Sequence, residues 1–250
     1  MKRFAFIFVC AIFFCRPMVA DAEEALIAVA TNFHPILVRL RDEFEATSSH
    51  HVELSGGSTG VLYAQITNGA PYDAFFAADQ LRPEQLEEDG TGVADSRFTY
   101  AEGRLAFWSA NAAFVRGSLQ ASLENTDLRV LAIANPDLAP YGRAAMEALH
   151  SLRSRNGFDL KVVQGENVGQ AFSMIATGNA DAGIVAMSSV VLAPDWLRGY
   201  FLEIPKDRHS PIFQDAILLK HGAQNQAALA FLAYLRSDTA RDKIASFGYQ

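Results

Sequence analysis

The sequence predicts an α/β protein with two lobes, each a mainly parallel sheet flanked by helices, joined by a double-strand hinge. Strand-like and helix-like segments alternate through almost the whole chain after residue 22. Repeated strand–helix–strand units of this kind form parallel sheets with helices on both faces. Two extended segments, 97–110 and 210–220, flank an inserted block of such units. We therefore expect the chain to cross between two lobes twice.

The first 22 residues have the pattern of a secretory signal peptide. A basic start precedes an apolar stretch over 4–15, and the small residues Ala20 and Ala22 frame a cleavage site, so cleavage is expected after Ala22. The apolar stretch is shorter than a membrane-spanning helix needs. Cys10 and Cys15 are the two cysteines, and neither has the small preceding residue of a lipoprotein signal. We expect an exported, periplasmic protein without disulfides.

The charge of the mature chain argues against several partners. Removal of residues 1–22 from the 250-residue chain leaves 228 residues, with 18 basic and 27 acidic side chains and a net charge of −9. Such a chain is a poor partner for nucleic acid or an anionic membrane surface. If the protein binds an anion, the site itself must supply the favourable interaction.

In the predicted first lobe, residues 23–100 and 210–250, strands and helices follow one another closely. Ile36, Leu40 and Phe44 form one apolar stripe with Leu37 beside it, which indicates an amphipathic helix. Strands are expected over 26–30, 51–55 and 72–78, and helices over 33–48, 61–69, 80–90, 225–237 and 239–248.

The predicted second lobe, residues 101–209, repeats the alternation. Pro140 stands where proline is favoured, at the first position of a helix. Strands are expected over 128–134, 160–165 and 180–186, and helices over 140–154 and 167–178. Phe75, Phe76, Phe107 and Trp108 lie in strand-like segments of the two lobes and are expected in the core.

Four strand-to-helix turns carry the same chemistry. In open α/β sheets, ligands bind where strands end and helices begin. Each turn offers free backbone N–H groups and the positive end of a helix dipole, and its Ser, Thr and Asn side chains are neutral donors. No turn contains lysine, and Arg143 is the one arginine nearby. The candidate residues are Thr31, Asn32, Ser58, Thr59, Tyr141, Asn167 and Val168.

Each turn also has a simpler interpretation. Ser, Thr and Asn are the usual N-caps of any helix. Gly56, Gly57 and Gly60 could merely permit a tight turn, and Tyr141 could be a core aromatic with a satisfied hydroxyl. The recurrence of such turns in both lobes favours an anion site built from neutral donors.

Rival chemistries match the sequence less well. Residues 56–60 read G-x-S-x-G, the motif of a hydrolase nucleophile at Ser58, and Asp195 with His209 or His221 could complete a triad. The motif comes early in the chain, however, and no HGGG-type loop accompanies it. A phosphate loop needs lysine after its last glycine, where this chain has valine. No histidine or cysteine pair has metal-ligand spacing.

Several motifs, in the same order along the mature chain, resemble the periplasmic molybdate-binding proteins of ABC transporters. They are AVATNF, GSTGVLYAQITNGAPYDAFFAAD, IANPDLAPYG, ENVGQAFSMIATGNADAGIVA and the C-terminal FLAYLRS and FGY. The resemblance implies a type II-like periplasmic-binding-protein fold that closes on a tetrahedral oxyanion. It implies ligand contacts at Thr31, Asn32, Ser58, Thr59, Tyr141 and Val168, the last two mainly through backbone N–H groups. Thr59 stands where relatives often have serine. Ala186 stands where many have tyrosine, so that contact is not carried over.

The expected function is capture of molybdate and tungstate and their delivery to a membrane permease. A donor-only site favours a fully deprotonated dianion, because every contact to it can be a donated hydrogen bond. An inward-pointing Glu166 would instead make phosphate plausible. The alternatives are another oxyanion, such as sulfate or phosphate, and a secreted serine hydrolase. We expect a monomer that is not an enzyme, with no cofactor and no directly ligated metal.

Overall fold

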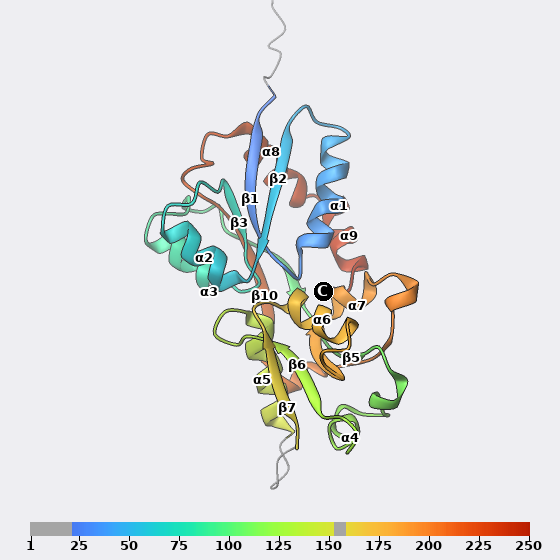
Figure 1. Ribbon diagram of the computed structural model, residues 1–250. Helices are drawn as coiled ribbons and strands as arrows, with labels where there is room; N and C mark the ends of the chain where they lie inside the picture. Colours follow the sequence, from blue (N-terminus) through green and yellow to red (C-terminus); the bar gives the residue numbers. More distant parts are fainter. Residues whose placement is uncertain (1–21, 153–158) are drawn as a thin grey trace, which may run out of the picture.

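Two five-stranded sheets form the framework of the protein in the computed structural model, which describes residues 22–152 and 159–250. The predicted signal peptide lies outside these residues, except for Ala22. Figure 1 shows one sheet in the upper half and the other in the lower half; we call these lobes I and II. The lobe I sheet has the order β2 (His51–Gly57), β1 (Glu24–Ala30), β3 (Ala74–Phe76), β10 (Ile212–Leu218) and β4 (Phe98–Gly103). The lobe II sheet has the order β7 (Lys161–Gly165), β6 (Val130–Ala134), β8 (Ala182–Ala186), β5 (Leu105–Ser109) and β9 (Tyr200–Glu203).

Both sheets are mixed, whereas the sequence predicts mainly parallel ones. In lobe I, β1 pairs in parallel with β2 and β3, and β10 pairs antiparallel with β3 and β4. In lobe II, β6 pairs in parallel with β7 and β8, and β5 pairs antiparallel with β8 and β9. The antiparallel pairings all involve the strands on either side of the lobe crossings. A strand that arrives from the other lobe needs no crossover helix, so it can run against its neighbours.

The helices cover both faces of each sheet. Lobe I carries α1 (His34–Glu45), α2 (Thr59–Thr67), α3 (Leu81–Glu88), α8 (Gln226–Leu235) and α9 (Asp238–Ser246). Lobe II carries α4 (Leu119–Leu123), α5 (Pro140–Ser151), α6 (Val168–Ala176) and α7 (Met187–Val191). α4, α7 and β9 are not predicted from the sequence, and each is only four or five residues long. Among the described residues, no helix is both long and apolar enough to cross a bilayer.

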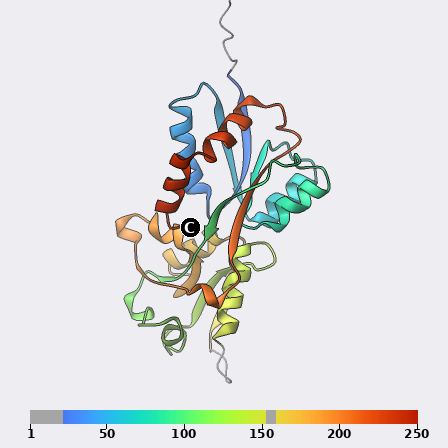
Figure 2. The same cartoon turned by 180° about the vertical axis from the view of Figure 1, so that it is seen from behind.

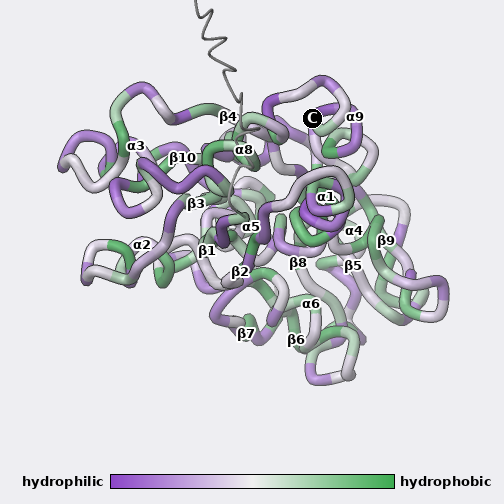
Figure 3. The backbone as a smooth tube through the Cα atoms, turned by 90° about the horizontal axis from the view of Figure 1, so that it is seen from above, coloured by the Kyte–Doolittle hydropathy of each residue, from purple (hydrophilic) through white to green (hydrophobic). Residues whose placement is uncertain are grey.

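The side chains of β1 point alternately to the two faces of the sheet, and this explains how lobe I packs. Ile27 and Val29 belong to one apolar cluster with α1 and α8, whereas Ala28 belongs to a second cluster with α2. Successive strand residues point to opposite faces, so one strand serves both clusters. In Figure 3, hydrophilic stretches gather on outer loops and hydrophobic stretches run along elements such as β6.

The core of lobe II includes Trp108, whose ring stacks on Phe172 with centroids 4.3 Å apart. The side chains of Phe107 and Trp108 are fully buried, as are those of Phe75 and Phe76 in lobe I. The prediction that these four aromatics are core residues is confirmed.

The chain crosses between the lobes along two strands. β4 leads through Arg104 directly into β5, and β9 leads through residues 204–211 into β10. Seen from behind, the two crossings run close together down the middle of the molecule (Figure 2). Glu102 on β4 also exchanges two backbone hydrogen bonds with Gln250. The predicted boundaries between the lobes stay a prediction, and the one after residue 100 would fall inside β4.

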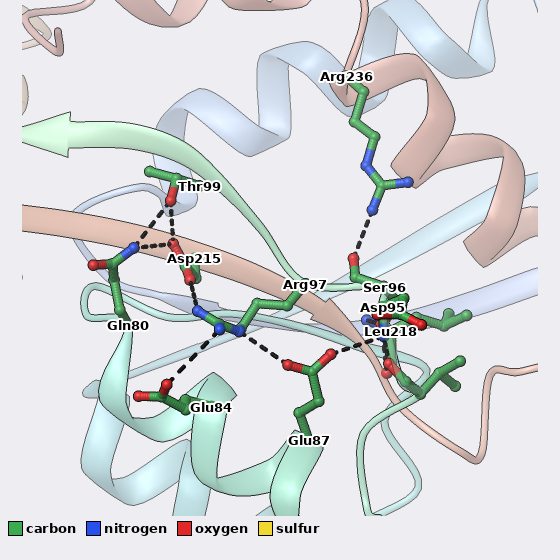
Figure 4. Close-up of polar contacts among 11 residues, drawn as sticks. Gln80, Glu84, Glu87, Asp95, Ser96, Arg97, Thr99, Asp215, Leu218 and Arg236 are labelled. Atoms are coloured by element: carbon green, nitrogen blue, oxygen red, sulfur yellow. Dashed lines mark hydrogen bonds and ion pairs between the residues drawn. The ribbon is translucent and has the colours of Figure 1, made fainter.

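A buried charge network fixes β10 to α3 and β4. The carboxylate of Asp215 accepts hydrogen bonds from Arg97 at 2.8 Å, Thr99 at 2.6 Å and Gln80 at 3.1 Å (Figure 4). Arg97 also contacts Glu87 at 3.2 Å. The bond to Asp215 is the main cause of a raised pKa at Arg97. Because its three partners come from outside β10, Asp215 links the crossing strand to α3 and to the start of β4.

Candidate anion-binding site

A small cavity lies between the lobes, where strands end and helices begin. Its volume is about 10 Å³, near the least that holds one water molecule, so a larger anion must push the walls apart slightly. The structure brings all six predicted ligand residues, and also Asn167, to this cavity. Its lining is Ala30, Thr31, Asn32, Gly57, Ser58, Thr59, Ala78, Ala139, Pro140, Tyr141, Asn167 and Val168.

Three helices begin at the cavity. Ser58 is the N-cap of α2 and Asn167 the N-cap of α6, and the side chain of each accepts a hydrogen bond from the first turn of its helix. α5 begins with Pro140, which has no N–H to satisfy. The positive ends of three helix dipoles therefore converge on one point, from α2 in lobe I and from α5 and α6 in lobe II.

The backbone N–H groups around the cavity are the main donors. In the first turn of α2, the N–H groups of Gly60 and Val61 already have acceptors. Among the described residues, no acceptor is present for the N–H groups of the cavity-lining Asn32, Ser58, Thr59, Tyr141 and Val168. Buried N–H groups in proteins are almost always paired. A ligand that accepts hydrogen bonds on all sides would satisfy this set.

Two hydroxyls add to these donors. Ser58 Oγ accepts from the Val61 N–H, and Thr59 Oγ1 accepts from the Ala78 N–H at 3.0 Å. Their own hydrogens have no acceptor within the described part of the chain, and both side chains are buried. Thr31 differs, because its hydroxyl donates to the Gly57 carbonyl at 3.0 Å. Ser58 and Thr59 are thus the hydroxyl donors available to an anion.

The side chains of Asn32 and Tyr141 contact a buried polar network. The amide nitrogen of Asn32 donates to Gln214 Oε1 at 2.8 Å and to Tyr249 Oη at 2.9 Å. Gln214 Nε2 donates to Tyr141 Oη at 3.0 Å. Tyr141 is therefore a core aromatic with a satisfied hydroxyl, and its contribution to the cavity is its backbone N–H.

Burial keeps the tyrosines of this network neutral. It raises the pKa of Tyr249 to about 12, and those of Tyr100 and Tyr141 well above the ordinary value. Their hydroxyls stay protonated at physiological pH. Tyr100, Gln214 and Ser188 also support the site and are not among the residues predicted from the sequence. The available signal was the polar pair Gln214–Asp215 inside an otherwise apolar strand.

The turn that contains Gly56, Gly57 and Gly60 is tight, since β2 ends at Gly57 and α2 begins at Thr59, but it does not use the conformational freedom of glycine. None of them has a positive φ. A Cβ on Gly60 would lie 3.0 Å from the Leu138 carbonyl oxygen, to which the Gly60 N–H donates at 2.9 Å. Gly60 is thus a close contact between α2 of lobe I and the loop before α5 of lobe II.

Asp79 makes a second contact between the lobes, beside a larger cavity of about 320 Å³ that shares Ala78 and Pro140 with the small one. The carboxylate pairs with Arg82 in its own lobe at 2.5 Å and with Arg143 of lobe II at 3.0 Å. Both arginines near the site are therefore paired with the same carboxylate, and the three groups together keep one positive charge. The small cavity is lined by neither a carboxylate nor a basic side chain, and Glu166 is exposed outside its lining.

The residues that could form a hydrolase triad with Ser58 do not come together in the structure. His221 pairs with Asp73 at 2.8 Å, and His209 contacts the Ser210 carbonyl. Asp195 pairs with Arg198. Within residues 22–152 and 159–250, no histidine contacts Ser58 and no cluster of potential metal ligands is present. Ser58 has the surroundings of a hydrogen-bond donor, without the base that a nucleophile needs.

Comparisons with known proteins identify the family. The family model described as bacterial extracellular solute-binding protein matches residues 25–250. The chain belongs to this family. It is similar to the molybdate-binding protein ModA of Azotobacter vinelandii, with 42% identity over 92% of this chain and 91% of that protein. The ModA protein of Rhodobacter capsulatus is 40% identical over 92% of this chain and 89% of its own length.

The solved structure of an Azotobacter vinelandii periplasmic molybdate-binding protein has a TM-score of 0.82 with 35% identity, covering 90% of this chain and 98% of that one. The predicted type II-like fold is confirmed by this match. The sulfate-binding protein SubI of Mycobacterium tuberculosis has a TM-score of 0.71 but only 13% identity, over 92% of this chain and 86% of its own, which shows a shared fold alone. This member of the solute-binding family is a binding protein and not an enzyme.

Proposed function

We propose that this protein captures molybdate, and also tungstate, between its two lobes and delivers it to the permease of an ABC transporter. One observation carries the proposal: five backbone N–H groups and two hydroxyls, which have no acceptor in the described part of the chain, converge on a cavity lined by no charged side chain. Such a site suits a tetrahedral dianion, which accepts hydrogen bonds in every direction and donates none. The named function of relatives at 40% and 42% identity supports molybdate.

The ligand contacts we propose are five of the six that the sequence predicts, and they differ in the groups that they supply. Asn32, Tyr141 and Val168 supply backbone N–H groups, and Ser58 and Thr59 supply both N–H and hydroxyl. Thr31 positions the turn through its bond to Gly57. We further propose cleavage after Ala22, a monomeric periplasmic protein, and closure of residues 101–209 onto 23–100 and 210–250 around the ligand.

Thermal unfolding with added anions tests the proposal. A ligand at a hundred times its dissociation constant stabilises the folded state by about 2.7 kcal/mol. For a chain of this length, that raises the melting temperature by roughly 5–10 °C. We expect this shift with 1 mM molybdate and with tungstate. No shift with molybdate would contradict the function, and an equal shift with phosphate would contradict the donor-only argument.

Replacing Thr59 with alanine is expected to lower molybdate affinity by about tenfold, because one donor to the anion is lost. The Ala78 N–H also loses its acceptor, so a stability loss of about 1–2 kcal/mol accompanies it. Calorimetric titration and thermal unfolding measure the two effects. Thr59→Ser keeps the hydroxyl and is the control; if Thr59→Ala bound as tightly as Thr59→Ser, the hydroxyl would not contact the anion.

A further inference from the structure

Gln214 lies at the centre of the buried network behind the cavity. Its side chain is fully buried on β10, the second strand to cross between the lobes. Its Oε1 accepts from the amide of Asn32 at 2.8 Å and from the hydroxyl of Tyr100 at 3.0 Å. Its Nε2 donates to Tyr141 Oη at 3.0 Å. One neutral side chain therefore touches a cavity wall residue of lobe I and one of lobe II.

The orientation of this amide follows from its partners. The Nδ2 group of Asn32 uses both hydrogens, one on Gln214 and one on Tyr249. The atom of Gln214 that faces Asn32 must therefore be the acceptor oxygen, which turns Nε2 toward Tyr141. Glutamine meets both demands at once, because it carries an acceptor and a donor on one rigid group.

β4, the first strand to cross between the lobes, packs against the hydrogen bond between Gln214 and Tyr141. A Cβ added to Gly103, the last residue of β4, would lie 2.3 Å from Tyr141 Oη and 2.6 Å from Gln214 Nε2. The hydroxyl of Tyr141 is thus held between both crossing strands. Ser188 of lobe II adds a parallel contact by donating to the Asn32 carbonyl at 3.2 Å.

We propose that Gln214 is a positioning residue that couples the two walls of the anion cavity. It holds the turn of Asn32 and the start of α5 at Tyr141 in the spacing that aims their backbone N–H groups at one ligand. When the lobes part, the bond between Gln214 and Tyr141 breaks while the bond to Asn32 within lobe I remains. Closure therefore assembles the donor set and the network in the same step.

A charge at position 214 should affect anion binding. Gln214→Glu keeps the shape of the side chain and places an ionisable group directly behind an anion site. The titratable groups facing this position are Tyr100 and Tyr141, which stay neutral, and the flanking carboxylates Asp215 and Asp79 are each paired with arginine. A buried carboxylate at position 214 would then repel a bound dianion and lose that effect when protonated.

The test is calorimetric titration of molybdate between pH 5 and 8, and it rests on the proposed function. For Gln214→Glu we expect affinity at least about tenfold below the natural protein at pH 8, recovering as the pH falls, since a buried like charge costs more than one factor of ten. For the natural protein we expect a flatter profile. Gln214→Met, which keeps the size but removes all three side-chain hydrogen bonds, should weaken binding by about ten- to hundredfold without the pH recovery.

Two further variants separate positioning from folding. Tyr141→Phe removes the hydroxyl that Gln214 contacts while the backbone N–H stays, so it should reproduce part of the Gln214→Met loss even if Gln214→Met folds poorly. Gln80→Met is the matched control. Gln80 bonds Thr99 and Asp215 beside the network without lining the small cavity, so this change should lower stability and leave affinity unchanged.

The outcomes distinguish this inference from the proposed function. If the natural protein binds molybdate but Gln214→Glu has the same affinity and pH profile, or Tyr141→Phe binds normally, Gln214 does not position the site. If the natural protein binds no molybdate, the proposed function fails and this inference fails with it.

Discussion

Replacing Gly169 with alanine is expected to weaken anion binding by about five- to a hundredfold while leaving the fold intact. Gly169 lies in the first turn of α6 in lobe II, and a Cβ there would come within 2.5 Å of the Thr31 side-chain methyl in lobe I. Overpacking of this kind costs about 1–3 kcal/mol. The clash arises across the lobes, so it penalises closure. In the open form, alanine should slightly favour the helix.

The partner residue offers a direct rescue. Thr31→Ser removes the clashing methyl and keeps the hydroxyl that donates to the Gly57 carbonyl. The double variant Gly169→Ala/Thr31→Ser should therefore recover most of the affinity in titration with molybdate. Gly117→Ala is the matched control, since nothing lies within 4 Å of a Cβ there. Normal binding by Gly169→Ala, or failure of the rescue, would show that this contact does not limit closure.

Much of the site was predictable because it follows from where strands end. Ser58 and Thr59 follow the parallel strand β2 in lobe I, and Val168 follows the parallel strand β7 in lobe II. In each sheet, ligand-binding groups are expected beyond the carboxyl ends of the parallel strands. The donors of each lobe could therefore be predicted without knowledge of longer contacts, whereas the way the two edges face each other depends on how the chain crosses between the lobes. The core aromatics were predictable for a similar reason, since apolar strand segments are buried on both faces.

The supporting residues were not predictable, because they depend on contacts between distant parts of the chain. Asn32 and Tyr249 are 217 residues apart, and Asn32 and Gln214 are 182 apart. Local patterns give no information on such pairs. The glycines show the same limit: the motif around Ser58 suggests a turn, whereas Gly60 is small because the Leu138 carbonyl of lobe II approaches it.

The antiparallel strands and short elements were missed for physical reasons of their own. The segment 97–110 reads as one extended run, but it contributes β4 to one sheet and β5 to the other. β9 is an edge strand with Tyr200 and Phe201 both exposed, so it lacks the alternation that marks a half-buried strand. Whether a crossing strand runs parallel or antiparallel to its neighbours depends on the side from which the chain enters the sheet. That is a property of the whole fold.

Replacing Asp215 with alanine is expected to destabilise the protein by about 2–3 kcal/mol, because Arg97, Thr99 and Gln80 all lose a buried acceptor. This loss of stability is smaller than the largest losses caused by removing one partner of a buried ion pair. The side chain of Arg97 is 29% exposed and keeps its ion pair with Glu87, so its charge remains paired. In thermal unfolding, the melting temperature should fall by roughly 4–12 °C.

Glu84 provides the control within the same network (Figure 4). Its carboxylate is 3.9 Å from Arg97 and its side chain is 51% exposed, so Glu84→Ala should change stability by less than about 0.5 kcal/mol. Asp215→Asn should fall between the two, since it keeps an acceptor for Thr99 but removes the charge that faces Arg97. Equal melting temperatures for Asp215→Ala and Glu84→Ala would mean that backbone pairing and apolar packing hold the crossing strand without help from the carboxylate. The buried carboxylate beside Gln214 would then have no part in fixing the strand that links the two walls of the site.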